Sequence, residues 1–268
     1  MHKDTPLWKW ALLLILAIVL GFIGMLLLKV WNDSVDGIAL LLLGPVAWLA
    51  VYYGGVRLIE RRPANDLPLR RLAPDIGLGL LTGILFISCV VGLLVAFGYA
   101  HLVPREDTWK AQLLSFCLCL GTAVGEEVLF RGILFRWIDE RSGVIPALVV
   151  SGLVFGFLHL GNPGATVWSS VAIAIEAGLL LGAAYKWSGT LWLPIGIHWS
   201  WNYVQGSIYG IAVSGGSRPH SLYDTVMEGP DLITGGAFGV EASVISVALG
   251  AILSAFFLYL RFRKRDSD

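Results

Sequence analysis

Two adjacent glutamates and an arginine interrupt an otherwise apolar stretch of the chain. The stretch reads GEEVLFRGILFRW, from Gly125 to Trp137, and contains Glu126, Glu127 and Arg131. Ionisable side chains inside a bilayer are costly, and by default they indicate a functional site. Glu127 and Arg131 are four residues apart, in the order that favours an ion pair along a helix. The spacing therefore predicts that Arg131 neutralises Glu127.

Glu126 has a different orientation from its neighbour. Consecutive residues of a helix are rotated by about 100°, so Glu126 and Glu127 cannot point the same way. If Glu127 pairs with Arg131, Glu126 is left as the free carboxylate. A free carboxylate in an apolar setting can act as a general base.

Two further polar insertions occur at a depth compatible with Glu126. The first is FGFLH, which ends at His159, and the second is HWSWN, from His198 to Asn202. Two helices that turn near Ser142 would place Glu126 and His159 each about 24 Å from the turn. His198 and Asn202 lie side by side at i and i+4 on a third helix. The chain can thus build a buried cluster of one carboxylate, two histidines and an amide.

Composition places this cluster in a membrane protein. The chain has 268 residues, is 56% hydrophobic and has only 14% charged residues, whereas soluble domains have about 25%. Its mean hydropathy is +0.75. The net charge is zero, and no basic stripe or zinc-finger spacing indicates a nucleic-acid partner. We expect a single integral-membrane domain over residues 1–268, with the polar motifs in about 110–205.

Apolar stretches of helix-spanning length recur along the whole chain. They predict an all-α bundle of about eight transmembrane helices, over residues 7–28, 38–57, 75–99, 110–136, 144–160, 165–185, 190–211 and 241–261. The first stretch is too long for a cleaved signal and is expected to remain as a span. The lysines and arginines gather in the terminal segments and alternate loops, which predicts cytoplasmic N- and C-termini.

The three polar motifs resemble those of a known family, the CAAX-protease and bacteriocin-processing (CPBP) intramembrane proteases, which are related to type II CAAX prenyl endopeptidase. The motifs of that family are EExxxR, FxxxH and HxxxN/D, in this order on separate membrane helices. Here they correspond to Glu126–Arg131, Phe155–His159 and His198–Asn202. The resemblance covers roughly residues 110–205. It implies an intramembrane endopeptidase acting on a membrane-anchored, prenylated or hydrophobic peptide.

The resemblance also implies roles for individual residues. Glu126 with His159 would activate a water molecule. His198 and Asn202 would stabilise the oxyanion of the tetrahedral intermediate.

Three other residues of the motifs would support the catalytic ones. Glu127 and Arg131 would hold the first motif in place. Phe155 would pack one turn below His159 and help to fix its ring.

A metal is a separate question. Glu126, His159 and His198 could hold zinc with an open position for water. However, the chain has no HExxH motif, and the two histidines lie on different helices. We favour a glutamate-dependent reaction without a metal, and zinc is the alternative.

Two other functions remain open at the level of sequence. The first is a non-catalytic membrane scaffold or immunity protein that retains the protease fold. The second is a transporter that uses Glu126 and Glu176 as relay groups, although no paired broken spans support it. The residues leave undecided the natural substrate, the oligomeric state, and the roles of Glu176 and of the loop over residues 214–239. We expect an integral, multi-pass protein of a prokaryotic cell membrane.

Overall fold

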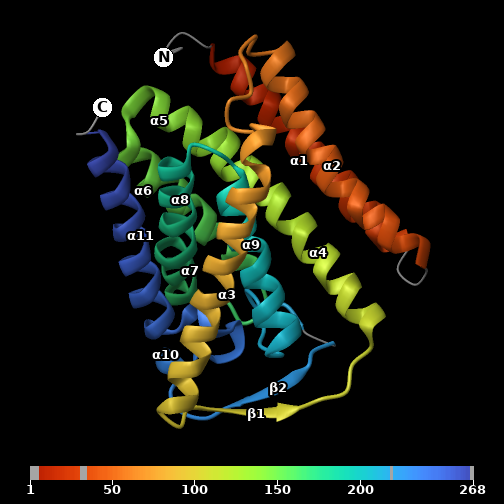
Figure 1. The fold of residues 1–268 in the computed structure, drawn as a ribbon, viewed down its shortest axis with the longest axis vertical. Helices are drawn as coiled ribbons and strands as arrows, with labels where there is room; N and C mark the ends of the chain where they lie inside the picture. Colours follow the sequence, from red (N-terminus) through yellow and green to blue (C-terminus); the bar gives the residue numbers. More distant parts are fainter. Residues whose placement is uncertain (1–5, 31–34, 218–219, 266–268) are drawn as a thin grey trace.

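Helices make up most of the described chain, which confirms the all-α prediction (Figure 1). The computed structural model describes the backbone of residues 6–30, 35–217 and 220–265, and the side chains of residues 6–19, 41–217 and 220–263. The α-helices are α1 (Leu7–Val30), α2 (Val35–Leu58), α3 (Leu72–Ala96), α4 (Trp109–Glu127), α5 (Arg136–Ser142), α6 (Val144–Leu158), α7 (Val167–Ile173), α8 (Leu180–Ser188), α9 (Trp192–Tyr203), α10 (Asp231–Thr234) and α11 (Val244–Arg265). Three π-helical segments continue them: η2 (Val128–Phe135), η4 (Ala174–Leu179) and η5 (Val204–Ile208).

Six helical segments are long and apolar enough to cross a membrane, which confirms a polytopic membrane protein. They match the second to sixth and the eighth of the expected spans. Their bounds are Leu41–Leu58, Leu69–Ala96, Trp109–Ser142, Val144–Gly161, Val167–Ser188 and Val244–Arg263.

The first and seventh expected spans correspond to α1 and α9. In α1 the described apolar part is Leu7–Val19. Helix α9 has 12 residues and continues through η5 for 5 more, so it is shorter than expected. Nearly all of α9 is buried, because other helices surround it. It is therefore an interior helix that carries the third motif into the centre of the bundle.

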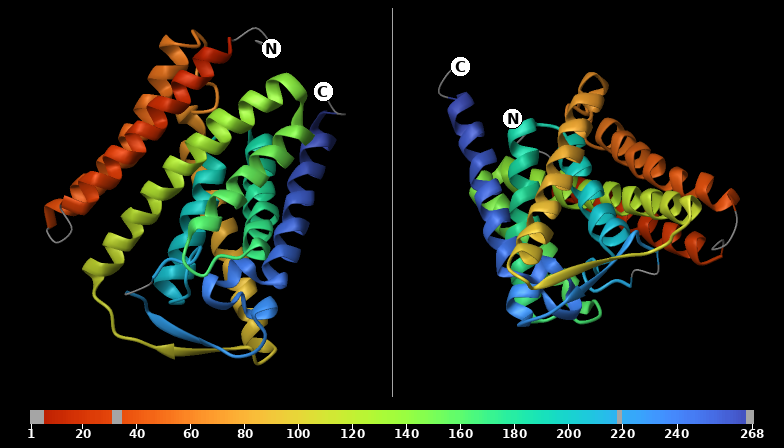
Figure 2. Two further views of the ribbon diagram at one scale, coloured as in Figure 1. Left: turned by 180° about the vertical axis from the view of Figure 1, so that it is seen from behind. Right: turned by 60° about the horizontal axis from the view of Figure 1, so that its bottom comes forward.

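The first and the last helix of the chain place its two ends on the same side of the molecule. Helix α1 begins and α11 ends at the same end of the bundle (Figure 2). This placement is required if both termini face one compartment. That the compartment is the cytoplasm stays a prediction.

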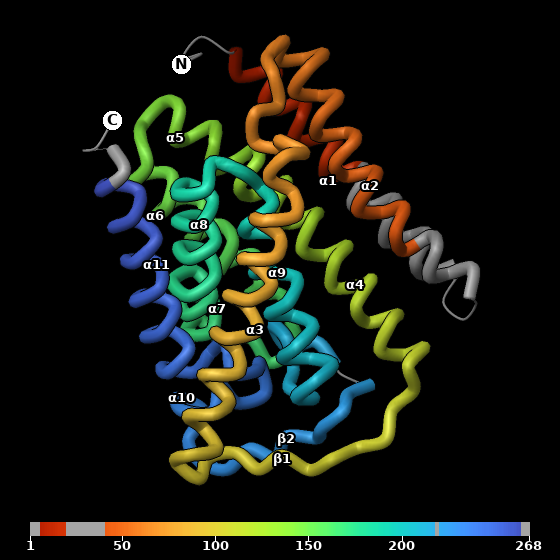
Figure 3. Tube along the Cα trace, in the orientation of Figure 1, coloured from red at the N-terminus to blue at the C-terminus, as the bar shows by residue number. Residues whose placement is uncertain are grey.

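The hairpin of α1 and α2 forms one flank of the molecule, beside α4, and α11 lies on the opposite flank (Figure 3). Between them, α3 and α9 make the most extensive helix–helix contact. A Cβ on Gly79 would lie 2.5 Å from the Leu193 carbonyl oxygen, and one on Gly83 would lie 2.4 Å from that of Ile197. Only glycine permits such an approach of two backbones. The contact fixes the position of α9.

The hairpin of α5 and α6 turns where the sequence predicts. Helix α5 ends at Ser142 and α6 begins at Val144, and Gly143 between them has a φ of +88°. A left-handed residue at this point is favourable for glycine alone. The turn brings the first and second motifs side by side.

A buried ionic network ties the loop after α2 to α5. The Arg136 guanidinium donates to both carboxylate oxygens of Glu60, at 2.7 and 2.9 Å, and lies over the Trp10 ring. Arg62 donates to the same carboxylate at 2.6 Å. Bidentate pairing of this kind gives both affinity and fixed geometry. The network therefore joins three helices at the end of the bundle where the chain begins.

A small antiparallel sheet, which the all-α prediction did not include, crosses the other end of the bundle (Figure 1). Strand β1 (Ala100–Pro104) pairs with β2 (Tyr223–Met227), with Ala100 opposite Met227. It connects the segment before α4 with the loop after α9.

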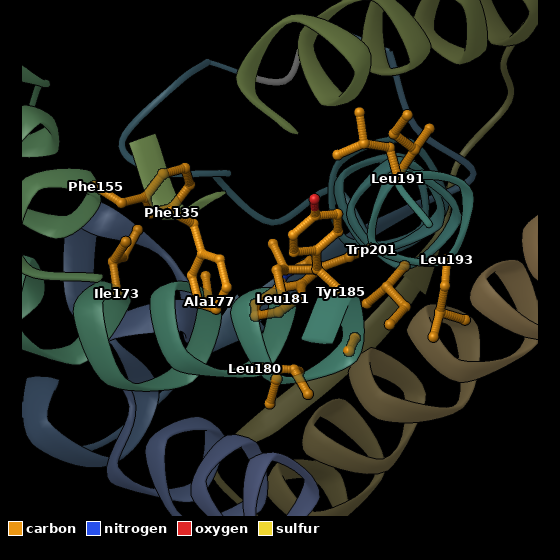
Figure 4. Packing of buried hydrophobic residues seen from close by; sticks show 14 of the residues in the cluster. Phe135, Phe155, Ile173, Ala177, Leu180, Leu181, Tyr185, Leu191, Leu193 and Trp201 are labelled. Carbon is orange, nitrogen blue, oxygen red and sulfur yellow. The ribbon is translucent and has the colours of Figure 1, made fainter. Parts of the chain in front are cut away.

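The hydrophobic core lies between α6, α8 and α9. Figure 4 shows part of it, where Leu181 and Tyr185 of α8 lie near Trp201 of α9. All three side chains are buried. The ring of Phe135 packs edge-on against Tyr185, with centroids 5.6 Å apart. The polar site described below adjoins this core.

Candidate active site

The three motifs meet at one cavity of about 270 Å³. Its walls include all four residues for which the sequence predicts catalytic roles: Glu126 from α4, His159 from the end of α6, and His198 and Asn202 from α9. The remaining lining residues are Leu118, Cys119, Thr122, Asn162, Val213, Ser214 and Gly216. The depth argument from the sequence therefore placed Glu126 and His159 correctly relative to each other.

The two glutamates face different surroundings, as their rotation on the helix predicts. The side chain of Glu126 is 29% exposed and lines the cavity, whereas that of Glu127 is fully buried. The expected ion pair is present, because the Arg131 guanidinium donates to Glu127 Oε1 at 2.8 Å. A buried pair is stabilised when further hydrogen bonds satisfy its partners.

One of two π-helical segments beside the pair supplies such hydrogen bonds. Segment η2 begins directly after Glu127, and η4 interrupts the helix that faces it. Arg131 donates to the carbonyl oxygens of Ala177 and Gly178 in η4, at 3.1 and 3.3 Å. Its guanidinium also lies 4.8 Å from the centre of the Phe155 ring. π-Bulges frequently occur at functional sites, and here one of them provides acceptors for a buried cation.

His198 bridges the two glutamates, a contact that the sequence did not reveal. Its Nδ1 lies 2.8 Å from Glu127 Oε1, and its Nε2 lies 3.8 Å from Glu126 Oε2. An ionised carboxylate only accepts hydrogen bonds, so Nδ1 carries a proton that it donates to Glu127. Glu127 thus orients the imidazole and directs Nε2 towards the cavity.

His159 is held by its own helix. Its Nδ1 lies 2.7 Å from the Phe155 carbonyl oxygen, which can only accept, so Nδ1 donates. The Phe155 and His159 rings are 4.8 Å apart, as the predicted packing requires, and Phe155 also contacts the His198 ring edge-on. In the neutral imidazole, Nε2 of His159 is then the nitrogen without a proton, which can accept a hydrogen bond from water.

A second, smaller cavity of about 20 Å³ adjoins the first. His159, His198, Asn202 and Ser214 line both cavities, and Glu241 lines only the smaller one. A volume of this size suits about one water molecule.

Sequence reasoning missed several residues of the site. Cys119 and Thr122 lie seven and four residues before Glu126 on the same helix face, a spacing that could have identified them. Asn162 follows His159 by three residues in the same turn and could have been found in the same way. Ser214 and Glu241 come from the long loop after α9 and carry no sequence signal.

Glu176 does not line either cavity. It is fully buried in η4, and its Oε2 accepts a hydrogen bond from the Ser246 hydroxyl of α11 at 2.7 Å. A Cβ on Gly250 would lie 2.8 Å from its Cα. These contacts favour a structural role for Glu176.

The candidate metal ligands are Glu126, His159 and His198. Among the residues that the structure describes, no three His, Cys, Asp or Glu side chains gather as a ligand set. Nδ1 of His198 is engaged with Glu127 and Nδ1 of His159 with a carbonyl oxygen, which leaves each Nε2 free, as in histidines that bind metals. A reaction without a metal therefore stays a prediction, and the steps proposed below use none.

Comparison with known proteins bears on these motifs. The model of the family described as type II CAAX prenyl endopeptidase Rce1-like matches residues 108–204, a range that contains all three motifs. Searches of curated proteins and of solved structures give no match. The match confirms the resemblance inferred from the sequence. Residues 108–204 thus match the type II CAAX prenyl endopeptidase Rce1-like family, and this segment is called the Rce1-like domain below; the match is consistent with a protease of the CPBP family.

Proposed function

We propose that the protein is an intramembrane endopeptidase that hydrolyses a peptide bond of a membrane-anchored, prenylated or hydrophobic peptide. The observation that supports this most directly is that Glu126, His159, His198 and Asn202 line one cavity within the Rce1-like domain. The cavity contains both accepting and donating groups.

Glu126 and His159 are suited to activate water. Glu126 is the carboxylate that is not held by Arg131, and His159 offers an unprotonated Nε2. In the proposed reaction, Glu126 removes a proton from a water molecule held against His159, and the hydroxide attacks the peptide carbonyl carbon. Glu126 then passes the proton to the leaving nitrogen, so that the carboxylate is regenerated.

His198 and Asn202 are suited to the oxyanion. The Asn202 amide is a neutral donor. His198 already uses Nδ1–H for Glu127, so it can donate into the cavity only if Nε2 is protonated as well. The oxyanion role therefore requires the imidazolium form, which lies between two carboxylates, Glu126 and Glu127. A cationic donor stabilises a developing negative charge more strongly than a neutral one.

The test is cleavage of a quenched fluorescent farnesylated CAAX peptide by the protein in nanodiscs. Glu126→Gln preserves shape and removes the base, so kcat should fall by at least about 100-fold. The matched control is Glu106→Gln, on the exposed segment before α4, which should cleave like the wild type.

Each outcome decides between functions. Cleavage by the wild type and by Glu106→Gln, but not by Glu126→Gln, supports the protease. Equal cleavage by all three would contradict the assigned base. If no farnesylated or hydrophobic peptide is cleaved, the scaffold becomes the better hypothesis. A chelator arm, with zinc added back, tests the metal-free form of the reaction.

A further inference from the structure

A buried carboxylate lies beside the site and is not used by the mechanism above. Glu241 belongs to a short 3₁₀-helix, η7 (Val240–Ala242), and is only 3% exposed. It lines the smaller cavity together with His159, His198 and Asn202. It lies outside the Rce1-like domain, which ends at residue 204. A buried acid of this kind needs a physical role.

The Glu241 carboxylate holds one particular turn of the chain. It accepts hydrogen bonds from the backbone N–H of Ser214 and from the Ser214 hydroxyl, the latter at 3.2 Å. On the other side, the Asn162 side-chain amide donates to the Ser214 carbonyl oxygen at 2.9 Å. Both backbone polar groups of Ser214 are thus engaged by side chains from other segments.

The turn has a conformation that serine does not favour. Ser214 and Gly215 have φ values of +49° and +79°, and the Gly216 N–H donates to the Val213 carbonyl at 2.8 Å. Two positive φ values in succession are characteristic of a type I′ turn, in which glycine, asparagine and aspartate predominate. Such a residue persists only when its surroundings determine its conformation. The hydrogen bonds of Ser214 with Glu241 and Asn162 provide these surroundings.

The turn forms part of the wall of the larger cavity. Val213, Ser214 and Gly216 line it together with Glu126. The Gly215 N–H donates to the Phe238 carbonyl at 2.8 Å, which anchors the turn to the segment before η7. The shape of the cavity therefore depends on the conformation of residues 213–216.

We propose that Glu241 is a positioning residue of the site, which holds the turn of residues 213–216 as the wall against which the peptide substrate is bound. This role rests on the proposed function. The hydrogen bonds of Glu241 described above go to Ser214, and the mechanism proposed above assigns Glu241 no chemical step. Its loss should therefore weaken substrate binding and leave the chemical step largely unchanged.

The first experiment detects the turn without any need for catalysis. Cys119 lines the same cavity and can report on access to it, once Cys89 and Cys117 have been replaced by alanine. In Glu241→Ala, the rate of alkylation of Cys119 by a maleimide should rise at least about fivefold, because the open form of the turn becomes more populated. Ser246→Ala is the matched control, since it removes a buried hydrogen bond to Glu176 and not to the turn.

The second experiment separates binding from chemistry in the peptide-cleavage assay. Glu241→Ala should raise KM about tenfold and change kcat less than about threefold, as expected for lost ground-state positioning. Glu241→Gln should restore most of the wild-type KM, because its amide can accept from the Ser214 N–H and donate to the hydroxyl. In a Ser214→Gly background the effect of Glu241→Ala should shrink, because glycine adopts a positive φ without support.

The outcomes distinguish the two proposals. Unchanged alkylation of Cys119 together with unchanged KM would overturn the positioning role. A fall in kcat at constant KM would overturn it as well, because it would make Glu241 a catalytic group. If Glu241→Ala exposes Cys119 but the wild type cleaves no peptide, the protease proposal fails and the holding of the turn by Glu241 is supported.

Discussion

Glu126 and Glu127 are neighbours of the same residue type, but their replacement should affect the stability of the protein very differently. Glu127→Gln leaves the Arg131 charge buried without its counter-ion and should cost about 3–5 kcal/mol of stability. Glu126→Gln removes a partly exposed carboxylate and should change stability by less than about 1 kcal/mol. Thermal unfolding of both variants in one detergent checks this contrast. Equal destabilisation by the two changes would contradict the separate roles.

Asn202 provides a second prediction at the level of single residues. Removing one oxyanion donor typically lowers kcat by about 10²–10³. We therefore expect Asn202→Ala to lower kcat to this extent while the protein still binds the uncleaved peptide. A control is Ser200→Ala on the same helix, whose hydroxyl donates to the Gly196 carbonyl of α9 itself. If Asn202→Ala cleaves at the wild-type rate, Asn202 has no part in stabilising the oxyanion.

The residue types and their spacing were enough to predict which side chains meet, but not all of their contacts. The i,i+4 spacing predicted the pair of Glu127 and Arg131, because the helix fixes that geometry locally. The hydrogen bond between Glu127 and His198 joins residues 71 positions apart. Its formation depends on the rotation of α9 about its own axis, which hydrophobic patterning does not determine for a helix that is buried on all sides.

Among the helices, the contact of α3 with α9 sets the position of the third motif. The same substitution at two glycines of α3 tests this. Gly83→Ala places a methyl group 2.4 Å from a backbone carbonyl oxygen of α9, whereas Gly92 has no atom within 4 Å of that position. Gly83→Ala should therefore destabilise the protein by about 1–3 kcal/mol and lower activity, because α9 is displaced.

Gly92→Ala should instead stabilise the protein slightly, by up to about 1 kcal/mol, because alanine is the better helix former. Thermal unfolding and peptide cleavage of both variants provide the comparison. A destabilising effect of similar size at both positions would mean that the glycines act through helix propensity and not through packing against α9.

The helices themselves were largely predictable from the sequence, and their irregularities were not. All expected spans correspond to helical segments, because long apolar stretches have few alternatives in a bilayer. The π-helical turns after Glu127 and around Glu176 have no signature in residue type. They follow from tertiary contacts, such as those of Arg131 with the carbonyls of η4.

For the molecule as a whole, stability should depend on pH through the network that joins α2 and α5. Burial alone would raise the pKa of the Glu60 carboxyl, but the hydrogen bonds and charges of Arg136 and Arg62 outweigh it and hold the pKa below 4.5. Between the folded and unfolded pKa values the unfolded chain binds more protons. This contribution to stability is therefore fully present above pH 4.5 and is lost as the pH falls through the folded pKa.

Replacement of Glu60 by glutamine removes this titration, so the unfolding temperature of Glu60→Gln should fall less steeply below pH 4.5 than that of the wild type. The control is Asp224→Asn, which breaks a largely exposed pair with Arg105 and should leave the pH dependence unchanged. Parallel curves for Glu60→Gln and the wild type would show that other carboxylates govern the acid transition.

Because α3 contacts α9 so closely, the segment that matches the family model cannot build the site without the rest of the chain. Residues 108–204 carry all three motifs, yet the helix against which the third motif packs lies before them, and the acid that holds the Ser214 turn lies after them. Strands β1 and β2 flank the segment on either side and join those outer parts to each other. If this segment were placed in another helical bundle, it would carry its reactive groups. It would lack both the face of α3 that contacts α9 and the turn of residues 213–216 that forms part of the cavity wall. The segment that can be recognised by similarity is thus smaller than the part of the chain that is needed to form a working site.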